Sequence, residues 1–276
     1  MFVNVTEPIN VIKISKMEGL KMDYRNFDIN FGADGKTVLV TGAAEGIGQA
    51  TAIMFARKGA NIVCFDLKEG EHTKEEVEKH GRRFVSVVGD ITKDEDIKRA
   101  VDTAIREFGK IDVLINCAGI GILEKVEEVT DSIWQKTFDV NLTGSFKMTR
   151  EVGKTMLKNG GGKIVCIASQ AGVVALDKHV AYGCTKAGII QLVKQCALEW
   201  ARYNININAI SPTVILTALG EMNWNNAAGE AFKQTIPARR FGYPEEVAAC
   251  AVYLASDAAS LINGANIVID GGFTIG

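Results

Sequence analysis

From residue 37 onward, short runs of apolar and largely β-branched residues alternate with longer stretches in which apolar residues recur at helical spacing. The short runs are apolar throughout and do not alternate with polar residues. That pattern is typical of strands in a parallel sheet that is covered by helices on both faces. It predicts an α/β fold, a doubly wound sheet of about seven parallel strands in a single domain. The expected strands are residues 37–41, 61–66, 83–90, 111–119, 162–169, 204–212 and 265–272.

Two segments fall outside this alternation. Residues 1–31 precede the first strand by more than a strand requires, so we predict an N-terminal extension (1–31) to a domain that spans 32–276. Residues 213–243, between the sixth strand and a helix expected near Pro244, form the longest stretch without a clear pattern. Long connections at the carboxyl ends of parallel strands are where ligands bind. We therefore expect 213–243 to form a lid over a substrate.

Composition and charge exclude several classes of function. The chain of 276 residues has 31 Lys and Arg against 33 Asp and Glu, scattered along its length. It lacks the basic stripe that a phosphate backbone requires, so nucleic acid is not an expected partner. No membrane span is expected, because no apolar window reaches about 18 residues, and the N-terminus shows no secretory signal. The six cysteines form no C-x-x-C pair and no metal-binding spacing. We predict a cytoplasmic protein with reduced thiols and no metal site.

A glycine-rich turn follows the first expected strand. Gly42, Gly46 and Gly48 have the spacing G-x-x-x-G-x-G and precede an amphipathic stretch. Glycines at such a turn let the backbone approach a pyrophosphate at a helix N-terminus. A tight strand-to-helix turn favours glycine for conformational reasons as well, so the motif alone also fits a structural role.

The second expected strand supports a nucleotide. It ends in Asp66, 18 residues after Gly48, where an acidic side chain can accept hydrogen bonds from both hydroxyls of an adenosine ribose. A carboxylate there also repels a 2′-phosphate, and Glu45 in the glycine turn adds a second negative charge. NAD is therefore the expected cofactor in preference to NADP, although Lys68 is close enough to weaken the repulsion.

Five motifs in register resemble those of the short-chain dehydrogenase/reductase family. The resemblance covers about residues 33–276 and implies a Rossmann-type fold and an oxidoreductase that uses a nicotinamide cofactor. The interval of 13 residues between Ser169 and Tyr182 and the closing "GANIVIDGGFT" also match the family. The five motifs are "TGAAEGIG" (41–48), "NCAG" (116–119), Asn141, Ser169 and Tyr182-x-x-x-Lys186.

The resemblance implies roles for the matching residues. Asp90 would bind the adenine amino group with Ile91 beside the ring, and Asn116 to Gly119 would line the cofactor and support the central strand. After the sixth strand the family has Pro-Gly-x-x-x-Thr, whereas this chain has "PTVILT", with Thr213 in place of the glycine. The resemblance therefore does not determine the path of the backbone at this position. The expected cofactor-binding residues are Gly42, Glu45, Gly46, Ile47, Gly48, Asp66, Asp90, Ile91, Asn116, Ala118, Gly119, Tyr182, Lys186, Pro212, Ile215 and Thr217.

Tyr182 and Lys186 lie four residues apart in a stretch that is expected to be helical, so both project from one face. A free phenol titrates near about 10 and is a poor base at neutral pH. A nearby ammonium group and the positive nicotinamide ring of NAD both stabilise the phenolate. We therefore predict that Tyr182 exchanges a proton with the substrate oxygen, with Lys186 also donating to the ribose.

Two further residues complete the predicted catalytic set. Ser169 would hydrogen-bond the same substrate oxygen, and the resemblance implies that Asn141 holds a water in a proton relay. Each residue taken alone has an ordinary structural explanation, and it is their combination that favours catalysis. The predicted catalytic residues are Asn141, Ser169, Tyr182 and Lys186.

The expected lid is the part of the chain that informs on the substrate. Trp224 lies in "NWNNA" (223–227), which places neutral hydrogen-bonding groups beside an aromatic plane, and no arginine precedes Arg239 in the lid. Such a surface suits an uncharged polyhydroxylated molecule, although the same asparagines would equally solvate a loop. The rest of the chain also resembles the polyol and sugar-alcohol dehydrogenases of the family. We predict NAD-dependent oxidation of a secondary alcohol in a small polyol to a ketone, with Ser169, Tyr182 and Trp224 contacting the substrate.

Two alternatives remain open at this point. One is reduction of a 3-oxoacyl thioester on an acyl carrier protein, which would favour NADPH and a basic docking patch that the sequence does not show. The other is a non-catalytic nucleotide-binding scaffold, which the intact catalytic set disfavours. In this family the helices that match 137–157 and 181–202 pair across two-fold axes, so the resemblance also implies a homotetramer or homodimer.

Overall fold

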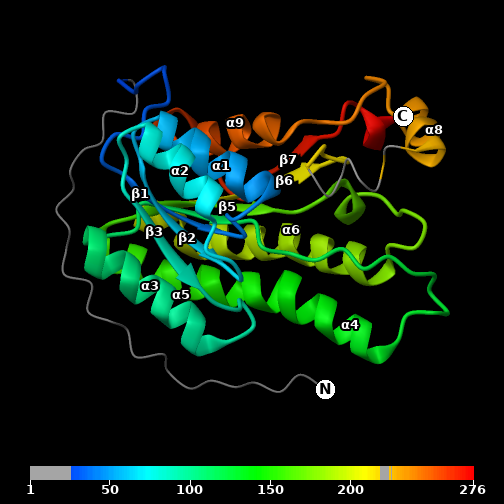
Figure 1. Ribbon diagram of the computed structural model, residues 1–276, viewed down its shortest axis with the longest axis horizontal. Coiled ribbons are helices and arrows are strands. Elements are labelled where there is room, and N and C mark those ends of the chain that lie inside the picture. The colour runs from blue at the N-terminus through cyan, green and yellow to red at the C-terminus, as the bar shows by residue number, and fades with distance from the viewer. Residues whose placement is uncertain (1–25, 218–223, 225) are drawn as a thin grey trace.

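The computed structural model describes residues 26–217, 224 and 226–276, and it confirms the predicted doubly wound sheet (Figure 1). Seven strands form one sheet in the order β3-β2-β1-β4-β5-β6-β7, and each adjacent pair is parallel. Each strand lies within a run that was expected from the sequence. The strands are β1 (Thr37–Thr41), β2 (Asn61–Asp66), β3 (Phe84–Val88), β4 (Val113–Asn116), β5 (Gly162–Ile167), β6 (Ile205–Pro212) and β7 (Asn266–Ile269).

Helices cover both faces of the sheet. They are α1 (Gly46–Arg57), α2 (Glu71–Lys79), α3 (Asp94–Phe108), α4 (Asp131–Phe138), α5 (Ser145–Asn159), α6 (Val180–Trp200), α8 (Ala227–Thr235) and α9 (Pro244–Leu254). Val38 and Val40 of β1 pack into one core with α1, α2 and α9, whereas Leu39 between them packs into a second core with α3, α5 and α6. In Figure 1 the first set of helices lies above the sheet and the second set below it. The strands are apolar throughout because both of their faces are buried.

The strand order reverses direction at β1. The chain runs from β1 outward through β2 and β3, and then returns to place β4 on the other side of β1. The connections that follow β1 and β4 therefore leave the carboxyl edge of the sheet toward opposite faces. In doubly wound folds this divergence opens a crevice in which ligands bind.

The segment 213–243 contains a helix that the sequence pattern does not predict. α8 occupies Ala227–Thr235 and is capped by Asn226, whose side chain accepts a hydrogen bond from the Gly229 N–H at 2.9 Å. The expectation of an irregular stretch is therefore wrong for this part, because a helix of nine residues is too short to show a clear period. Residues 218–223 and 225 of the expected lid lie outside the described residues.

α9 begins at Pro244, as predicted, and its first turn is closed by polar contacts. Proline is favoured at the first position of a helix because its missing N–H would have no partner there. The Glu246 carboxylate accepts a hydrogen bond from the Tyr243 N–H at 2.9 Å and pairs with Arg240 at 2.6 Å. The hydrogen bond from Arg240, followed by that from the Tyr243 backbone, lowers the pKa of Glu246 to about 2.

The predicted N-terminal extension is described from residue 26 onward. Phe31 packs edge-on against Tyr253 of α9, with ring centroids 5.3 Å apart. The N–H of Ala33 then donates to the carbonyl of Lys58 at 2.7 Å, just before β1 begins. The described end of the extension is therefore attached to the α1 and α9 side of the sheet, and residues 1–25 lie outside the described part.

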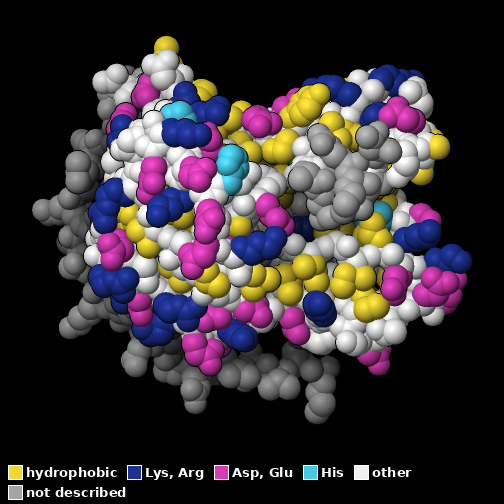
Figure 2. Space-filling model, in the orientation of Figure 1, with side chains coloured by type: hydrophobic (Ala, Val, Ile, Leu, Met, Phe, Trp, Pro, Cys, Tyr) yellow, Lys and Arg dark blue, Asp and Glu magenta, His cyan; other side chains and the backbone are white. Residues whose placement is uncertain are grey.

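The surface around α2 and α3 carries acidic and basic side chains interspersed with one another (Figure 2). Several of them form ion pairs along one helix, such as Arg99 with Asp96 at 2.5 Å. Within the described ranges, no helix combines the length and the apolar character that are needed to cross a membrane.

Candidate active site

The glycine-rich turn connects β1 to α1 and packs against the loop after β4. A β-carbon on Gly48 would lie 2.0 Å from the Gly42 carbonyl oxygen, and a β-carbon on Gly42 would lie 2.9 Å from Ala118 Cα. Gly42 and Gly46 have φ angles of 68° and 62°, which glycine adopts without strain. The side chain of Glu45, the N-cap of α1, makes no capping hydrogen bond. That side chain therefore leaves the first N–H groups of α1 available to an anion.

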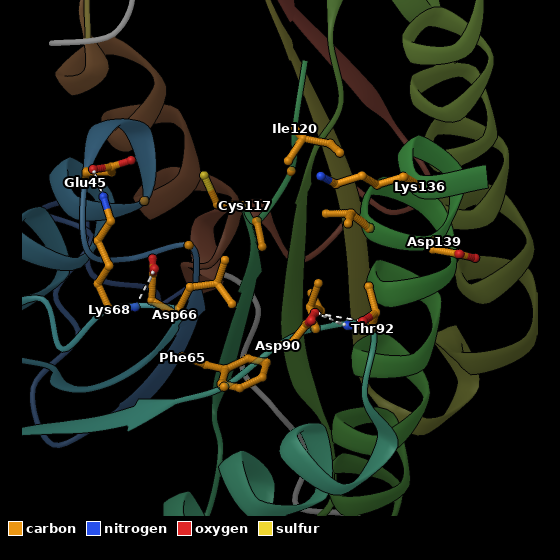
Figure 3. A pocket seen from close by; sticks show the side chains of 18 of the residues that line it. Glu45, Phe65, Asp66, Lys68, Asp90, Thr92, Cys117, Ile120, Lys136 and Asp139 are labelled. Carbon is orange, nitrogen blue, oxygen red and sulfur yellow. Dashed lines mark hydrogen bonds and ion pairs between the residues drawn. The ribbon is translucent and has the colours of Figure 1, made fainter. Parts of the chain in front are cut away.

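Asp66 lies at the end of β2, beside the glycine turn. Its carboxylate accepts hydrogen bonds from the N–H of Ala44 at 2.9 Å and of Lys68 at 3.2 Å. The ammonium group of Lys68 pairs with Glu45 at 2.9 Å, as Figure 3 shows. The hydrogen bond and the charge of Glu45 raise the pKa of Lys68. The cation that the sequence places near Asp66 is therefore bound to the second carboxylate of this region.

A cleft of about 1040 Å³ opens along the carboxyl edge of the sheet. In Figure 3 one wall carries Glu45 and Asp66, and the facing wall carries Lys136 and Asp139 at the end of α4 and just beyond it. Phe65 lies between them at the lower side of the view. The predicted cofactor-binding residues all line this cleft, except for Gly46, Asn116, Tyr182, Lys186, Pro212 and Ile215.

Two predicted residues that follow β3 line the cleft. The Asp90 carboxylate accepts hydrogen bonds from the Thr92 N–H at 2.9 Å and from its hydroxyl at 2.8 Å, both through Oδ1. Ile91 is buried, and a β-carbon on Gly144 would lie 3.0 Å from it. These contacts hold the loop in place, and the adenine contacts of Asp90 and Ile91 stay predictions.

Asn116 connects the central strand to the helix layer. It is the last residue of β4 and is buried, and its Nδ2 donates to the Thr149 hydroxyl at 2.8 Å and to the Ser145 carbonyl at 3.3 Å. Asn116 thereby fixes β4 against α5, in agreement with the supporting role that the resemblance implies.

The segment after β6 follows a regular path despite the threonine at 213. The Thr213 N–H donates to the last carbonyl of β7 at 2.9 Å, which continues the pairing of β6 with β7. Thr213 does not adopt a positive φ. Ile215 then forms a parallel bridge with Gly242. A β-carbon on Gly46 would lie 3.2 Å from Thr217 Cγ2, so the segment returns to the glycine turn.

Tyr182 and Lys186 lie one turn apart on α6, with Lys186 Nζ 5.5 Å from the centroid of the Tyr182 ring. Lys186 is buried, and its Nζ donates to the carbonyl of Ile167 at the end of β5 at 2.8 Å. The Tyr182 ring is half-buried and meets the His179 ring edge-on, with centroids 6.0 Å apart. The phenol and the ammonium group therefore share one face of the helix, as their spacing predicts.

Asn141 lies in η1 (Asp139–Gly144), a π-helical segment that joins α4 to α5. Such wide turns occur frequently at functional sites. The Asn141 side chain exchanges two hydrogen bonds with the Ile120 backbone, accepting at 2.8 Å and donating at 2.9 Å. A β-carbon on Gly119 would lie 3.2 Å from Asn141 Oδ1 and 3.6 Å from Lys186 Nζ. Asn141 and Lys186 therefore flank Gly119 in the fold, although 45 residues separate them in the chain.

Ser169 is buried just beyond β5 and caps the 3-10 turn η2 (Gln170–Gly172). Its Oγ accepts a hydrogen bond from the Ala171 N–H at 3.1 Å. A β-carbon on Gly172 would lie 2.6 Å from the carbonyl carbon of Lys186, so this turn packs tightly against α6. The capping bond uses an acceptor position of the hydroxyl and leaves its hydrogen able to donate to a substrate oxygen.

Trp224, a predicted substrate contact, packs among other aromatic rings. Its ring centroid lies 5.3 Å from that of Phe232 and 5.8 Å from that of Phe241. Phe232 also contacts Phe273, near the C-terminus, at 5.3 Å. The described contacts of Trp224 therefore support α8, and its contact with the substrate stays a prediction.

Three further residues belong to the site but were not among the predicted site residues. The Thr41 hydroxyl accepts hydrogen bonds from the N–H groups of Cys117 and Ala118, both at 3.0 Å, and so attaches the loop after β4 to β1. The Thr185 hydroxyl accepts from Asn141 Nδ2 at 3.3 Å. Lys136 of α4 lines the cleft. The position of Thr41 at a strand end could have indicated it, whereas Lys136 enters the site only through the fold.

Three of the thiols are not poised to react. Cys117 lines the cleft, and burial raises its pKa to about 12. Burial also raises the pKa of Cys64 and of Cys166 to about 12. A thiol with such a pKa is not a nucleophile at neutral pH. Across the described part of the chain, no cluster of His, Cys, Asp or Glu could hold a metal ion.

The crevice fits a dinucleotide. A β-carbon does not fit at Gly48 in the glycine turn, and the uncapped N-terminus of α1 lies beside that turn. The backbone of the turn can therefore approach a pyrophosphate closely. Asp66 lines the cleft beside this turn, and Tyr182 and Lys186 lie on the helix that follows Ser169. A phenol next to a buried ammonium group, beside a nucleotide crevice, is what a nicotinamide-dependent oxidoreductase requires.

Comparison with known proteins agrees with this class. A family model described as enoyl-(acyl carrier protein) reductase matches residues 42–274. NAD-dependent glycerol dehydrogenase of Listeria innocua serovar 6a is 51% identical over 254 residues, which are 92% of this chain and 100% of that protein. D-threitol dehydrogenase of Mycolicibacterium smegmatis is 47% identical over 250 residues, 90% of this chain and 96% of that protein.

A solved structure agrees as well. The complex of 7α-hydroxysteroid dehydrogenase with NADH and 7-oxo glycochenodeoxycholic acid matches with a TM-score of 0.84 and 32% identity, over 88% of this chain and 96% of that chain. The chain belongs to the short-chain dehydrogenase/reductase family.

Proposed function

We propose that this protein uses NAD to oxidise a secondary alcohol of a small polyol to a ketone, reversibly. The observation that carries the proposal is the position of Lys186 Nζ, 5.5 Å from the centroid of the Tyr182 ring and beside the loop that lines the cleft. Similarity to an NAD-dependent glycerol dehydrogenase and to a D-threitol dehydrogenase supports a polyol as the substrate class.

The walls of the cleft would bind the cofactor. The first N–H groups of α1 would bind the pyrophosphate, and Asp66 the hydroxyls of the adenosine ribose. When bound, NAD accepts a hydride from the substrate carbon. Asp66 and Glu45 favour NAD over NADP, because their negative charges repel a 2′-phosphate.

The proton of the reaction passes through Tyr182. In oxidation the Tyr182 phenolate removes the proton of the substrate hydroxyl while the carbon loses its hydride, and in reduction the phenol returns a proton to the carbonyl oxygen. The ammonium group of Lys186 stabilises the phenolate, since charges attract more strongly where water is excluded. Ser169 donates its hydroxyl hydrogen to the same substrate oxygen. Asn141 would hold the water of a proton relay, while its side chain fixes the loop at Ile120.

The two alternatives have less support. An acyl-thioester reductase that uses NADPH would be opposed by the carboxylates of Asp66 and Glu45, and the neighbouring Lys68 is paired with Glu45. A non-catalytic scaffold would have no use for a buried lysine at Tyr182.

A panel of sugar alcohols and diols tests the proposal, with NADH absorbance followed at alkaline pH. Turnover of glycerol or threitol with NAD is the expected result. Activity that is confined to acyl thioesters with NADPH would overturn the proposal in favour of the first alternative. NAD binding without any turnover would overturn it in favour of the second.

Tyr182→Phe tests the mechanism. The variant should lose at least about 10²–10⁴-fold in kcat, because the group that exchanges the proton is gone. NAD affinity, measured by fluorescence titration, should stay within about twofold, since the ring and Lys186 remain.

Tyr203→Phe is the matched control, because this tyrosine lies in the turn after the end of α6, whereas Tyr182 lies near its start. It should keep wild-type turnover. Substantial turnover by Tyr182→Phe would contradict the assignment of the proton to this phenol.

We also propose that copies of the chain associate as a homotetramer or homodimer through helices 137–157 and 181–202. Phe146 and Leu157 on α5 and Leu198 on α6 are 42%, 39% and 77% exposed in the single chain. Large exposed apolar side chains on neighbouring helices favour burial against a second copy. A cytoplasmic location stays a prediction from the sequence.

A further inference from the structure

Three buried polar atoms at the carboxyl edge of the sheet have no hydrogen-bond partner among the described residues. They are Asn116 Oδ1, Gln170 Oε1 and Thr213 Oγ1. They follow three adjacent strands, β4, β5 and β6. Leaving a buried polar atom unpaired costs about 1–3 kcal/mol, so such atoms are few in folded proteins. Their concentration at the edge that carries the catalytic residues indicates a ligand.

Gln170 and Thr213 follow two neighbouring strands, β5 and β6, at the carboxyl edge of the sheet. Ile167 pairs with Ile210 in the ladder between β5 and β6, and Gln170 and Thr213 each follow three residues later. The 3-10 turn that begins at Gln170 contacts both β6 and α6. Gln170 directly follows Ser169 in the chain and is 3% exposed. Gln170 is therefore next to Ser169 in the chain, and Thr213 follows the strand that the turn of Gln170 contacts.

The fold does not account for these two polar groups. The Gln170 backbone carbonyl accepts hydrogen bonds from the N–H groups of Val173 and Val174, which any residue would do equally well. The Thr213 N–H continues the pairing with β7, which also needs no hydroxyl. A methionine at 170 and a valine at 213 would fill similar volumes without burying an unpaired polar atom. The amide and the hydroxyl are therefore of use only when something binds them.

We propose that Gln170 and Thr213 form a subsite for the hydroxyl group next to the carbon that is oxidised. This inference rests on the proposed polyol oxidation. A hydroxyl group donates to Gln170 Oε1, or accepts from the amide nitrogen if the amide is rotated, because a hydroxyl has both capacities. The Thr213 hydroxyl can likewise donate or accept. Since both groups are uncharged, the subsite selects neutral hydroxylated substrates over simple alcohols.

Gln170→Met and Thr213→Val test this subsite with variants of nearly unchanged shape. Each variant should lower kcat/KM for glycerol or threitol about tenfold to a hundredfold, because a buried substrate hydroxyl then loses its partner. Each should leave kcat/KM for 2-butanol, which has no second hydroxyl, within about twofold of the wild type. An equal loss on both substrates would show a structural role and overturn the proposal.

Thermal unfolding without substrate gives a second result that does not depend on turnover. Both variants should melt at the wild-type temperature or above it, because they remove a buried atom that is unpaired until substrate binds. A lower melting temperature in both would show that the polar groups serve the fold, for instance through a structural water, and would overturn the proposal.

Ser86→Ala is the matched control. Ser86 Oγ is another buried atom without a partner among the described residues, but Ser86 lies within β3, the edge strand of the sheet, away from β5 and β6. Its replacement should leave kcat/KM unchanged for polyols and for 2-butanol.

Failure of the subsite and failure of the proposed function are distinguishable. A wild type that oxidises polyols, with variants that do so equally well, refutes the subsite alone, whereas a wild type inactive on every polyol refutes the function.

Discussion

Single residues at the proposed ribose end of the cleft would decide the choice of cofactor. Asp66 supplies a carboxylate at the end of β2, and one of its oxygens also holds the Ala44 N–H of the glycine turn. Lys68 is the cation nearest to it in the chain, and Glu45 pairs with that cation. In the proposed function, the preference for NAD therefore rests on a repelling carboxylate together with a lysine whose charge is already compensated.

Replacing these carboxylates should shift the preference toward NADP. Asp66→Ser should raise the ratio of kcat/KM for NADP to that for NAD by about tenfold or more, since like charges a few Å apart cost on the order of 1–4 kcal/mol. Glu45→Gln should add a smaller gain, because it releases Lys68 to meet the 2′-phosphate. The gain from Glu45→Gln should disappear when Lys68→Gln is introduced as well. Steady-state kinetics with both cofactors measures these ratios.

Glu69→Gln serves as the control for charge alone. Glu69 is exposed in the same connection and does not line the cleft. Its replacement should leave the ratio unchanged. If Glu69→Gln shifts the ratio as much as Glu45→Gln does, the overall charge of the region decides the preference and the pairing of Lys68 does not.

At the scale of elements, the starts of two helices differ in a way that follows their roles. α1 begins after Glu45 without a side-chain cap, which leaves its first N–H groups open toward the cleft. α9 begins at Pro244, and Glu246 bonds to the backbone N–H of Tyr243 while pairing with Arg240. The open helix start faces the site, whereas the closed one serves stability.

Glu246→Gln should destabilise the start of α9. Loss of the ion pair and of the charged capping contact should lower the melting temperature by about 2–4 °C at neutral pH. The pKa of Glu246 is lowered from 4.5 to about 2 in the folded protein. Its ionised form therefore stabilises the fold fully above about pH 4.5, and this contribution is lost as the pH falls toward 2.

Melting curves of wild type and variant across this range check the prediction. The difference between them should be largest near neutral pH and should shrink between pH 4.5 and 2. Glu245→Gln, at the neighbouring position in the same turn, should show a smaller effect. A difference that is constant with pH would mean that the charge of Glu246 is not what stabilises the helix.

At the scale of the whole molecule, the layered fold leaves helix surfaces that a single chain does not cover. One core packs α1, α2 and α9 on the sheet, and the other packs α3, α5 and α6. The outer faces of α5 and α6 keep large apolar side chains, among them Phe146 and Leu198, exposed to solvent. Association through these faces would bury them, and would also hold α6, which carries Tyr182 and Lys186.

Phe146→Glu together with Leu198→Glu should weaken that association. A wild-type protein that behaves as a dimer or tetramer in light scattering should shift to a smaller species, because each copy would bury two charges in the interface. Val126→Glu is the control, since this residue is 71% exposed in a loop outside both helices. A wild type that is monomeric, or a double variant with unchanged mass, would contradict the proposed interface.

Sequence by itself determined the features that depend on short-range spacing. Each of the seven strands lies within a predicted run, because burial on both faces leaves a continuous apolar signature. The glycine turn, Asp66 and the shared face of Tyr182 and Lys186 follow in the same way from local periods and turn geometry. The family resemblance added Asn141 and Ser169, whose partners lie far along the chain.

Tertiary structure alone decided which distant residues meet. The crossovers of the sheet bring Lys136 to the cleft and place Gln170 and Thr213 after neighbouring strands, and no local pattern records such pairs. The nine residues of the short helix α8 are too few to show a clear hydrophobic period in the sequence. The helix is instead supported by aromatic packing against Phe273, a contact that only the fold creates. Whether Lys68 stays free or pairs with Glu45 is likewise settled only when β2 and the glycine turn lie side by side. Local order follows from the period of the side chains, whereas contacts across the sheet follow from how the strands are ordered.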